Sequence, residues 1–515
     1  MRSASSRALG VPSQRSASVR MPAGRPTPDA LALKLLVALA AASFGAHLFV
    51  AGDYGYFRDE LYYIADGRHL QLGYVDQPAL MGWLAALLRV TDGDGLVAIH
   101  TIPALACALI IVVTGRMARE LGGGRVAQLV AGVAALFCLD FMATGSIFSM
   151  DALDQLWWAL ASLILIRLLR RDSPRLWLLV GLVGAVALLT KLTVLFFGLA
   201  LVLALLVTPE RRTLRTPWPW LAGGIAFSGL VPYLIWNAVN GWPTWEFWHH
   251  YGGIGTSPLA FFTAQIGQMN PVAVPLAAAG LVFYFRRTGA RYRLLGWAFV
   301  FVYVLLTLVR TKPYFLAPAY PILFAAGAVV FERWAPRPRL AWIRPAYVAL
   351  LALAGLLLAP AVMPILPPET AVHAYGSLEQ VLADRLGWES LTTTVEQVYA
   401  GLPPAQRAQA CVLASNYGEA GALSHLAAPG RLPAIISGHN NYYLWGPGTC
   451  TGEVLIGVGY PPADFKSTYA DVALAATQRC QYCVSFEREL PIVVASNPTI
   501  PIDLARLWPS VKHYD

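Results

Sequence analysis

The sequence predicts a polytopic α-helical membrane protein of about eleven spans that carries a small α/β domain at its C-terminal end. Of its 515 residues, 57% are hydrophobic and only 13% are charged, whereas soluble proteins carry about 25% charged residues. Apolar runs recur throughout residues 31–366, and the composition of a soluble protein returns over 367–515. These two features divide the chain into a membrane domain and a C-terminal soluble domain.

The membrane domain contains eleven apolar segments that approach the roughly 20 residues needed to cross a bilayer. We expect spans at 31–51, 96–116, 126–144, 152–169, 176–190, 192–208, 218–236, 271–285, 294–309, 314–331 and 341–362. The stretch 176–208 is too long for one helix, so the polar pair Thr190-Lys191 is taken as the break between two. Long loops, 52–95 and 237–270, follow the first and seventh spans.

Arginine clusters follow each even-numbered span. They are Arg116, Arg119 and Arg125; Arg167, Arg170, Arg171 and Arg175; Arg211, Arg212 and Arg215; Arg286, Arg287, Arg291 and Arg293; and Arg333, Arg337, Arg339 and Arg344. Because basic loops remain in the cytoplasm, these segments are expected inside, and the odd-numbered exits outside. We therefore expect a multi-pass protein of the cytoplasmic membrane, in contact with membrane lipids, whose N-terminus is cytoplasmic and whose C-terminal domain is extracytoplasmic.

The net charge of +9 is unevenly distributed. Residues 367–515 hold 13 Asp/Glu and 8 Lys/Arg, so the basic excess belongs to the short clusters of the membrane domain. That arrangement indicates membrane topology and argues against nucleic acid as a partner. Residues 1–30 are rich in Ser, Arg and Pro, which predicts a disordered cytoplasmic tail, although a transit peptide has a similar composition.

The C-terminal domain shows short strand and helix patterns. ACVLAS and EVLIGVG predict buried strands, and Glu419–Leu426 predicts the start of a helix. The segments Asn416–Glu419 and Gly438–Gly448 combine amide and aromatic side chains, which suit carbohydrate binding and are equally common in exposed turns.

The six cysteines fall into two groups. Cys107 and Cys138 lie in apolar spans and are expected to be inert core residues. An extracytoplasmic domain permits disulfides, and its four cysteines allow three complete pairings. These four are Cys411, Cys450, Cys480 and Cys483.

The first outer loop holds the segment that is most informative about chemistry. Asp59 and Glu60 stand next to each other just beyond the first span, flanked by aromatic residues. Carboxylates are costly to desolvate at a membrane surface, and one placed there can act as a general base toward a hydroxyl or amine. The alternative is a hydrated loop in which Asp caps a helix.

This segment resembles a known family. YFRDELYYIADGRHL and GYVDQPAL, together with SMDALDQLWW, LLTKLT and RTKPYFLAPAYP, are similar to the dolichyl-phosphate-mannose protein mannosyltransferases and the lipid A aminoarabinose transferases. These are membrane glycosyltransferases of the GT-C fold. The resemblance implies that Asp59 is the catalytic carboxylate, that Glu60 is its neighbour, and that Asp76 is the acidic residue of a second conserved element.

The resemblance also implies a reaction. A sugar β-linked to a polyprenyl phosphate would be transferred, with inversion, to a lipid, glycan or protein acceptor. The chain departs from the family at Gln77, where a lysine is expected, and at Ala79, where a second proline is expected. In the aminoarabinose branch that lysine contacts the carrier phosphate, so the departure puts that particular substrate in doubt.

Other cations on the outer side are candidates for binding the carrier phosphate. They are Arg58, Lys191, Arg310 and Lys312. Charge-assisted contacts to a leaving phosphate strengthen as negative charge develops on it. The alternative for a cation at the end of a span is that it extends to the interface without a specific ligand.

Two further features remain open. Asp151 and Asp154 begin the fourth span, where acidic residues favour a helix N-terminus, and the resemblance places such an Asp near the active cavity and the acceptor. Asp76 with His249 and His250 could bind a divalent metal, since imidazole and carboxylate suit zinc, but a pair of interfacial histidines without a metal is an equal alternative.

Two rival classes compete with an enzyme. A transporter or flippase of lipid-linked substrates would need charged groups near the bilayer midplane and broken helices, whereas the charges here lie at the outer ends of spans. An inactive protein that keeps the fold for binding or assembly is the second rival.

Overall fold

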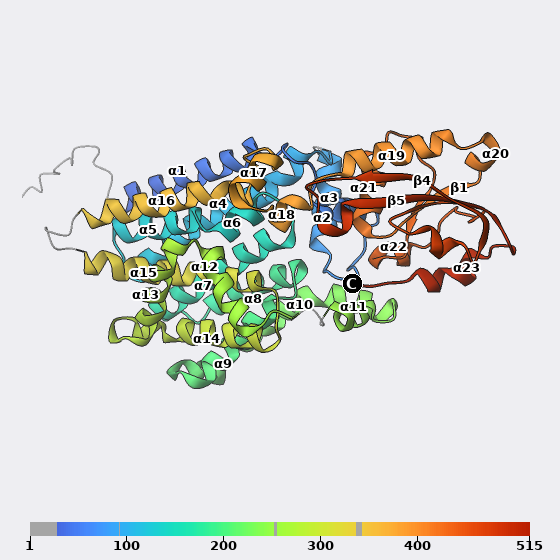
Figure 1. Cartoon of the computed structure of the whole chain (residues 1–515). Coiled ribbons are helices and arrows are strands. Elements are labelled where there is room, and N and C mark those ends of the chain that lie inside the picture. Colours follow the sequence, from blue (N-terminus) through green and yellow to red (C-terminus); the bar gives the residue numbers. More distant parts are fainter. Residues whose placement is uncertain (1–27, 92, 252–254, 336–341) are drawn as a thin grey trace, which may run out of the picture.

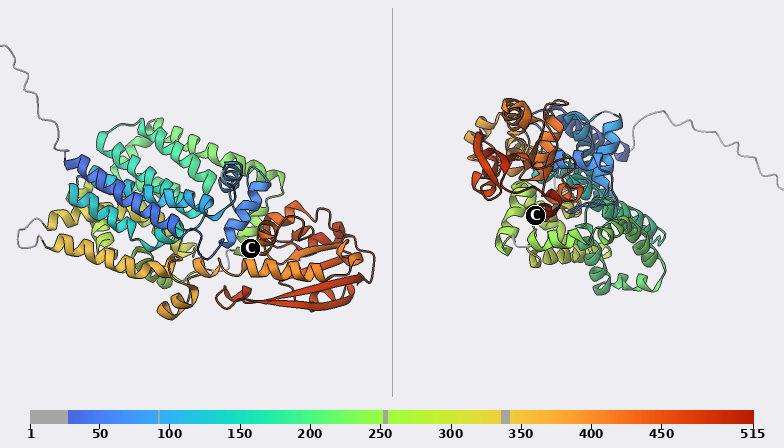
Figure 2. Two further views of the ribbon diagram at one scale, coloured as in Figure 1. Left: turned by 90° about the horizontal axis from the view of Figure 1, so that it is seen from above. Right: turned by 90° about the vertical axis from the view of Figure 1, so that its right-hand side faces the viewer.

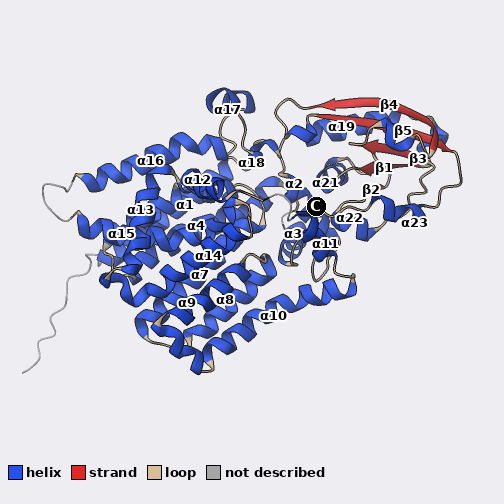
Figure 3. Ribbon diagram, turned by 60° about the horizontal axis from the view of Figure 1, so that its bottom comes forward, coloured by secondary structure: helices blue, strands red, loops and turns tan. Residues whose placement is uncertain are grey.

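A computed structural model describes residues 28–91, 93–251, 255–335 and 342–515. It consists of a helical bundle and a domain with a β-sheet, arranged end to end (Figure 1). All strands lie at one end of the molecule (Figure 3). The predicted tail, 1–30, falls almost entirely outside the described residues, because the first described helix begins at Pro28.

Helices make up the whole of the membrane part. They are α1 (Pro28–Phe49), α4 (Leu96–Glu120), α5 (Arg125–Leu136), α6 (Leu139–Gly145), α7 (Met150–Arg171), α8 (Leu176–Thr190), α9 (Val194–Val207), η1 (Pro209–Arg215), α10 (Trp218–Val239), α12 (Pro258–Met269), η2 (Pro271–Ala273), α13 (Val274–Phe285), η3 (Arg287–Tyr292), α14 (Arg293–Leu308), η4 (Pro313–Ala319), α15 (Tyr320–Trp334) and α16 (Ile343–Val362). Between this bundle and the sheet lie α2 (Arg58–Arg68), α3 (Leu80–Thr91) and α11 (Pro243–Tyr251).

The described residues contain seven helices that are long and apolar enough to cross a membrane, or ten if each of three bent pairs is one span. All eleven predicted spans coincide with helices, but α8 has only 15 residues and is not among these ten. The loop expected at 237–270 instead contains α11 and the apolar helix α12, which meets the following helix at 100°. Hydropathy located the helices of the eleven predicted spans, but neither α11, α12 nor the bends were predicted.

Small residues allow the bundle helices to pack closely. A Cβ on Gly229 of α10 would lie 2.0 Å from the carbonyl oxygen of Ala185 in α8. A Cβ on Gly327 of α15 would lie 1.9 Å from the carbonyl oxygen of Leu276 in α13. Glycine at these positions brings the backbones into contact, which is the usual basis of helix association in lipid.

One end of the bundle is held together by glutamates. Glu120, at the end of α4, accepts hydrogen bonds from Arg167 at 3.0 Å and Arg170 at 2.6 Å, both near the end of α7. Glu332 of α15 accepts from the first free amides of α5, including that of Val126 at 3.0 Å. Glutamate there satisfies unpaired N–H groups and favours the positive end of the helix dipole. The ends of α4, α7 and α15 and the start of α5 therefore share one face.

The sheet domain has five strands in the order β2-β1-β3-β5-β4. The strands are β1 (Ala410–Ala414), β2 (Ile435–Ser437), β3 (Val454–Val458), β4 (Tyr469–Arg479) and β5 (Glu489–Pro498). Strand β1 pairs in parallel with β2 and β3, while β5 pairs antiparallel with β3 and β4. The two predicted strands coincide with β1 and β3, but the long antiparallel pair β4 and β5 was not predicted.

The helices that follow the bundle lie mainly around the sheet, as the left view of Figure 2 shows, and the first of them contacts α16, where the hydroxyl of Tyr375 donates to the carbonyl oxygen of Leu357 at 2.7 Å. They are α17 (Pro368–Tyr375), α18 (Gln380–Ala383), α19 (Trp388–Gly401), α20 (Pro404–Arg407), α21 (Tyr417–Leu426), α22 (Asn440–Trp445), η6 (Pro462–Phe465), η7 (Ser485–Glu487), α23 (Leu504–Leu507) and η8 (Trp508–Val511). Two disulfides join Cys411 to Cys450 and Cys480 to Cys483, which is one of the three possible pairings. Cys107 and Cys138 are free and buried, as expected.

The segment that follows α1 contributes to the core of the sheet domain. Leu61 of α2 is fully buried in a cluster with Trp388, Leu391 and Ile456 of that domain. A Cβ on Gly421 of α21 would lie 2.9 Å from the Cβ of Leu61, so the two helices are in direct contact. Helix α2 is therefore fixed between the bundle and the sheet, and this arrangement positions its two carboxylates.

Candidate active site

The two adjacent carboxylates of α2 have different surroundings. Glu60 is fully buried, and its Oε2 accepts a hydrogen bond from the backbone amide of Phe57 at 2.7 Å. Its Oε1 accepts from His100 at 2.7 Å and from the amide of Phe148 at 2.6 Å. Burial alone would raise the pKa of Glu60, but His100, Arg385 and the Phe148 amide hold that pKa below its ordinary value. Glu60 therefore joins α2 to α4 and to the start of α7.

Asp59 has a hydrogen-bond partner of a different kind. Its Oδ1 accepts a hydrogen bond of 2.8 Å from the hydroxyl of Tyr417, the first residue of α21 in the sheet domain. Burial raises the pKa of Asp59, and the charge of Asp384 adds to this, while Tyr417, Arg58 and Lys312 oppose it. A carboxylate held in this way has the raised basicity that a general base needs.

A second pair of carboxylates lies beside Asp59. Asp76 accepts from the hydroxyl of Tyr62 at 3.2 Å, and burial together with the charge of Asp59 raises the pKa of Asp76 to about 7. Asp66 is fully buried and accepts from Gln77 at 2.8 Å and from Asn441 at 2.8 Å. Gln77 stands where the resembling family has a lysine. Because its side chain donates to Asp66, Gln77 is not available for a carrier phosphate.

Asp66 was not predicted to belong to the site. It lies seven residues after Asp59, which places both residues on the same face of α2. The sequence therefore contained a spacing from which Asp66 could have been predicted to lie near Asp59. Asn441 lies 375 residues from Asp66 and had no such signal.

Lys191, the residue that follows α8, lies in an ion pair. Its Nζ contacts Asp151 Oδ1 directly, and it also lies 4.6 Å from the ring centre of Phe315 and 5.2 Å from that of Tyr314. Asp151 begins α7, where its amide donates to the hydroxyl of Ser149. Lys191, predicted to bind the carrier phosphate, therefore pairs directly with Asp151, predicted to lie near the acceptor.

Arg310 and Lys312 lie between α14 and η4, as the sequence suggested. Lys312 is half-buried and close enough to Asp59 to oppose the rise in the pKa of that carboxylate. Arg310 is exposed and adopts a left-handed φ of 57°, and its carbonyl oxygen accepts from the amide of Thr256 at 3.2 Å. Of these two cations, Lys312 is the one that acts on Asp59.

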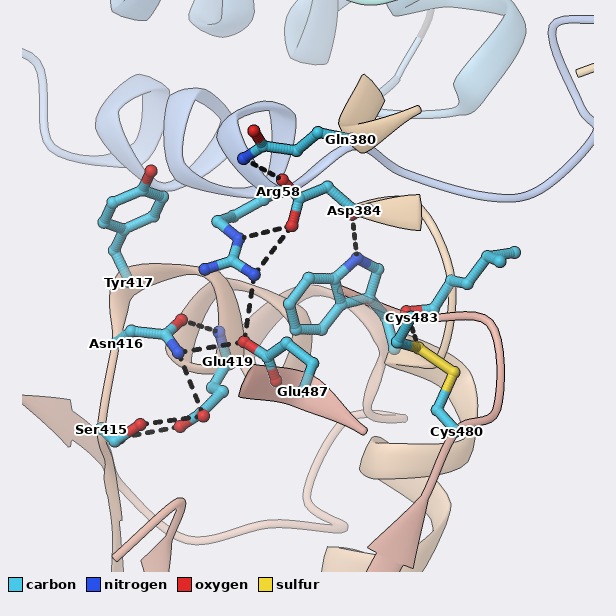
Figure 4. Close-up of polar contacts among 12 residues, drawn as sticks. Arg58, Gln380, Asp384, Ser415, Asn416, Tyr417, Glu419, Cys480, Cys483 and Glu487 are labelled. Atoms are coloured by element: carbon cyan, nitrogen blue, oxygen red, sulfur yellow. Dashed lines mark hydrogen bonds and ion pairs between the residues drawn. A yellow bond between two sulfur atoms is a disulfide. The ribbon is translucent and has the colours of Figure 1, made fainter. Parts of the chain in front are cut away.

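Arg58, predicted to bind a carrier phosphate, has two carboxylate partners in the sheet domain, and its contact with a phosphate stays a prediction. Figure 4 shows its guanidinium between Asp384 and Glu487 of the sheet domain, at 2.8 and 3.2 Å. It also lies 4.2 Å from the ring centre of Phe486. Since its side chain is buried and already paired with two carboxylates, Arg58 links α2 to the sheet domain.

The expected metal site is not formed among the described residues. His249 and His250 are exposed on α11, and His249 Nδ1 contacts the carbonyl oxygen of Trp245 in its own helix at 2.8 Å. Where the chain is described, the one group of three potential ligand residues is His439, His513 and Asp515. Asp76, His249 and His250 therefore do not gather around one point.

The ring nitrogens of this histidine group have partners within the protein. Both ring nitrogens of His513 face carbonyl oxygens, those of Val511 at 2.9 Å and Ser415 at 3.0 Å. His439 Nδ1 accepts from the amide of Tyr417 at 3.3 Å, and its Nε2 lies 2.9 Å from Asp515. All four ring nitrogens therefore have a polar neighbour within the protein, and neutral His513 donates through only one of its two.

The fold together with this site defines a class of protein. The chain is a polytopic helical membrane protein with the GT-C fold and a small C-terminal α/β domain, as predicted. The family described as dolichyl-phosphate-mannose-protein mannosyltransferase matches residues 76–236.

Particular relatives support this class. The lipid A galacturonosyltransferase RgtD of Rhizobium johnstonii is 28% identical over 291 residues, which are 53% of this chain and 59% of that relative. ArnT from Cupriavidus metallidurans bound to undecaprenyl phosphate has a similar structure, with a TM-score of 0.60 and 17% identity over 90% of this chain and 97% of that one. Its apo state gives a TM-score of 0.57 at 18% identity, over the same shares of the two chains.

Proposed function

We propose that this protein transfers a sugar from a polyprenyl-phosphate-linked donor to an acceptor outside the cytoplasmic membrane. The observation that carries the proposal is Asp59, a carboxylate with raised pKa, close to Lys312 at the outer end of the bundle. A base for the acceptor and a cation for the leaving phosphate are thereby near each other. A polyprenyl-phosphate donor is supported by the undecaprenyl phosphate found in ArnT, which has the same fold.

The reaction uses the site as follows. Asp59 accepts the proton of the acceptor's hydroxyl or amine, whose oxygen or nitrogen attacks the anomeric carbon from the face opposite the phosphate. The bond between that carbon and the phosphate oxygen breaks, and its electron pair leaves with the polyprenyl phosphate. Lys312, Lys191 and Arg310 are the cations proposed to stabilise the charge that develops there. The configuration at the anomeric carbon is inverted.

The transferred group is proposed to be a hexosyl or pentosyl unit. The name of RgtD favours the hexosyl class, in the form of a uronic acid, and favours a glycolipid acceptor such as lipid A. The engagement of Gln77 with Asp66 distinguishes this chain from the branch that uses a lysine at that position.

The proposed orientation places the sheet domain outside and the N-terminus in the cytoplasm. Its support is the face of the bundle at the ends of α4 and α7, where Arg167 and Arg170 pair with Glu120. Basic ends of this kind stay in the cytoplasm. A phosphatase fused after Asp515 should be active and one fused near Arg212 inactive, and the reverse pattern would overturn the orientation.

Transport of a lipid-linked substrate is the rival function. Polar groups do occur within the bundle, but Gln155 donates to Asp140 at 2.7 Å and accepts from Thr144 at 2.9 Å. These groups satisfy one another within the protein, as buried polar groups in a membrane normally do. Their mutual pairing does not favour transport over transfer.

The deciding experiment replaces Asp59 with Asn. The purified protein is given undecaprenyl-phosphate-linked hexosyl and pentosyl donors carrying a radiolabel in the sugar, with lipid A as the acceptor. Asn keeps the size of Asp but cannot accept the proton at neutral pH, so transfer should fall by about 10²–10⁴-fold while donor binding and thermal stability persist. Asp53→Asn, which changes an exposed carboxylate of the same loop, is the matched control. Unchanged turnover in Asp59→Asn would refute the assignment of the base.

A further inference from the structure

Tyr417 is the residue through which the sheet domain reaches the proposed base. Its hydroxyl donates to Asp59 Oδ1 at 2.8 Å, although the two residues are 358 positions apart in the chain. The phenol ring stacks on that of Tyr62 in α2, with ring centres 4.6 Å apart and an interplanar angle of 27°. Tyr62 in turn donates to Asp76, so one pair of stacked rings serves two carboxylates of the site.

The backbone around Tyr417 is held by several independent contacts. Helix α21 is capped by Asn416, whose side chain accepts from the amide of Glu419 at 3.0 Å. The amide of Tyr417 donates to His439 Nδ1 at 3.3 Å. A Cβ on Gly418 would lie 2.7 Å from the Cγ of Arg58, so α21 and α2 meet without space for a larger residue. These contacts fix the phenol hydroxyl relative to Asp59.

We propose that Tyr417 is a positioning residue of the active site, which holds Oδ1 of Asp59 and thereby directs Oδ2 toward the acceptor. This inference rests on the proposed function and deepens it. The sheet domain then completes the active site, because one of its side chains orients the base.

The charged and titratable groups around Asp59 determine what the loss of Tyr417 would do. They are Arg58 and Tyr63 from α2, Asp76 from the loop that follows, Lys312 from the segment before η4, Asp384 from the residue after α18, and Tyr417 from α21. Burial already raises the pKa of Asp59, and the hydroxyl of Tyr417 opposes this rise most among the neighbouring groups. Without that hydroxyl the pKa of Asp59 should rise further, because its ionised form loses a hydrogen bond.

The test compares pH profiles of the full-length protein in detergent or nanodiscs. Tyr417→Phe keeps the ring and its stacking on Tyr62 but removes the donor. The acid limb of kcat/KM should move upward by about one pH unit or more, because a hydrogen bond to a charged group is lost. At a pH below the limb, transfer should fall by about tenfold for each pH unit that the limb moves. Tyr469→Phe, which removes a buried hydroxyl bound to the carbonyl oxygen of Gly452 at 2.6 Å, is the matched control.

Two further measurements keep the inference testable if Tyr417→Phe folds poorly or the transfer assay fails. Replacing Tyr417 with 3-fluorotyrosine makes the phenol a stronger donor without changing the fold, and it should move the acid limb downward. Labelling of Asp59 by a hydrophobic carbodiimide, followed by mass spectrometry of the peptide, reports the protonated carboxyl without any turnover. The pH of half-labelling should rise in Tyr417→Phe and stay unchanged in Tyr469→Phe.

The outcomes separate this inference from the proposed function. Absence of transfer in the parent protein, with a shifted labelling curve in Tyr417→Phe, would refute the function while still showing that Tyr417 controls the protonation of Asp59. Normal transfer in the parent, with neither pH profile nor labelling curve shifted in Tyr417→Phe, would overturn the positioning role alone.

Discussion

Replacement of Arg58 by Gln should destabilise the junction between α2 and the sheet domain. Arg58 Nη2 lies 2.8 Å from Asp384 and 3.2 Å from Glu487, and the exposed fractions of these three side chains are 10%, 3% and 3%. Loss of one partner from a buried ion pair leaves an uncompensated charge and costs about 3–5 kcal/mol. Here two carboxylates lose their partner, so the upper part of that range is expected.

The assay is thermal unfolding of the purified protein, followed by limited proteolysis to locate the opened segment. Arg58→Gln should lower the melting temperature clearly and expose the sheet domain to cleavage. The double variant Arg58→Gln with Glu487→Gln should recover part of the loss, because one unpaired charge is removed. Arg479→Gln is the matched control, since its pair with Glu489 is 3.7 Å long and mostly exposed, and little change is expected.

A second measurement distinguishes this role from phosphate binding. If Arg58 contacted a carrier phosphate, Arg58→Gln would weaken binding of the donor lipid and leave the melting temperature unchanged. That result would refute the structural role assigned to Arg58.

Three other changes have definite expected outcomes. Glu60→Gln should lower thermal stability more than it lowers kcat in the folded fraction, because Glu60 accepts hydrogen bonds from His100 and two backbone amides; a stable but inactive variant would show that Glu60 takes part in the chemistry. Burial and the neighbouring Glu487 raise the pKa of Glu419 from 4.5 to about 8, so between these pH values the folded state binds more protons than the unfolded state. The free energy of unfolding should therefore fall as pH rises from about 4.5 to 8. Glu419→Gln should flatten this slope in urea titrations, and an unchanged slope would contradict the argument. Lys312→Ala should reduce transfer more than Arg310→Ala, since of these two cations only Lys312 is among the groups that act on Asp59; equal kinetics in both variants and the parent would leave neither as a ligand of the phosphate.

The helices of the bundle were predictable because lipid requires long apolar segments, and composition alone reveals these. Asp59 was predicted as the base from its resemblance to a family motif, since the cost of an acidic pair just outside a span left a capping role equally open. Its neighbour Glu60 was predicted to belong to the same catalytic pair, but the sequence did not show which way its side chain points. Adjacent residues on a helix point about 100° apart, and only the packing shows that Glu60 turns toward His100 while Asp59 turns toward Tyr417.

The features that sequence missed depend on contacts between distant segments. Arg58 is adjacent to the base in sequence, yet its partners Asp384 and Glu487 are 326 and 429 positions away. The strand pair β4 and β5 was missed for a local reason. Much of β4 is exposed, so its residues lack the alternation of buried and exposed positions that marks a half-buried strand.

The burial of Leu61 in the core of the sheet domain sets an order for biogenesis. Leu61 is synthesised more than 300 residues before its neighbours Trp388 and Leu391. At about 5–20 residues per second, α2 is synthesised tens of seconds before the domain that covers it. During that interval the apolar side chain of Leu61 has no protein cover, and the bilayer surface is the nearest apolar surface. A fragment excised at residue 367 would lack Leu61 and Arg58, so it would begin folding with a gap in its core and two carboxylates without their cation.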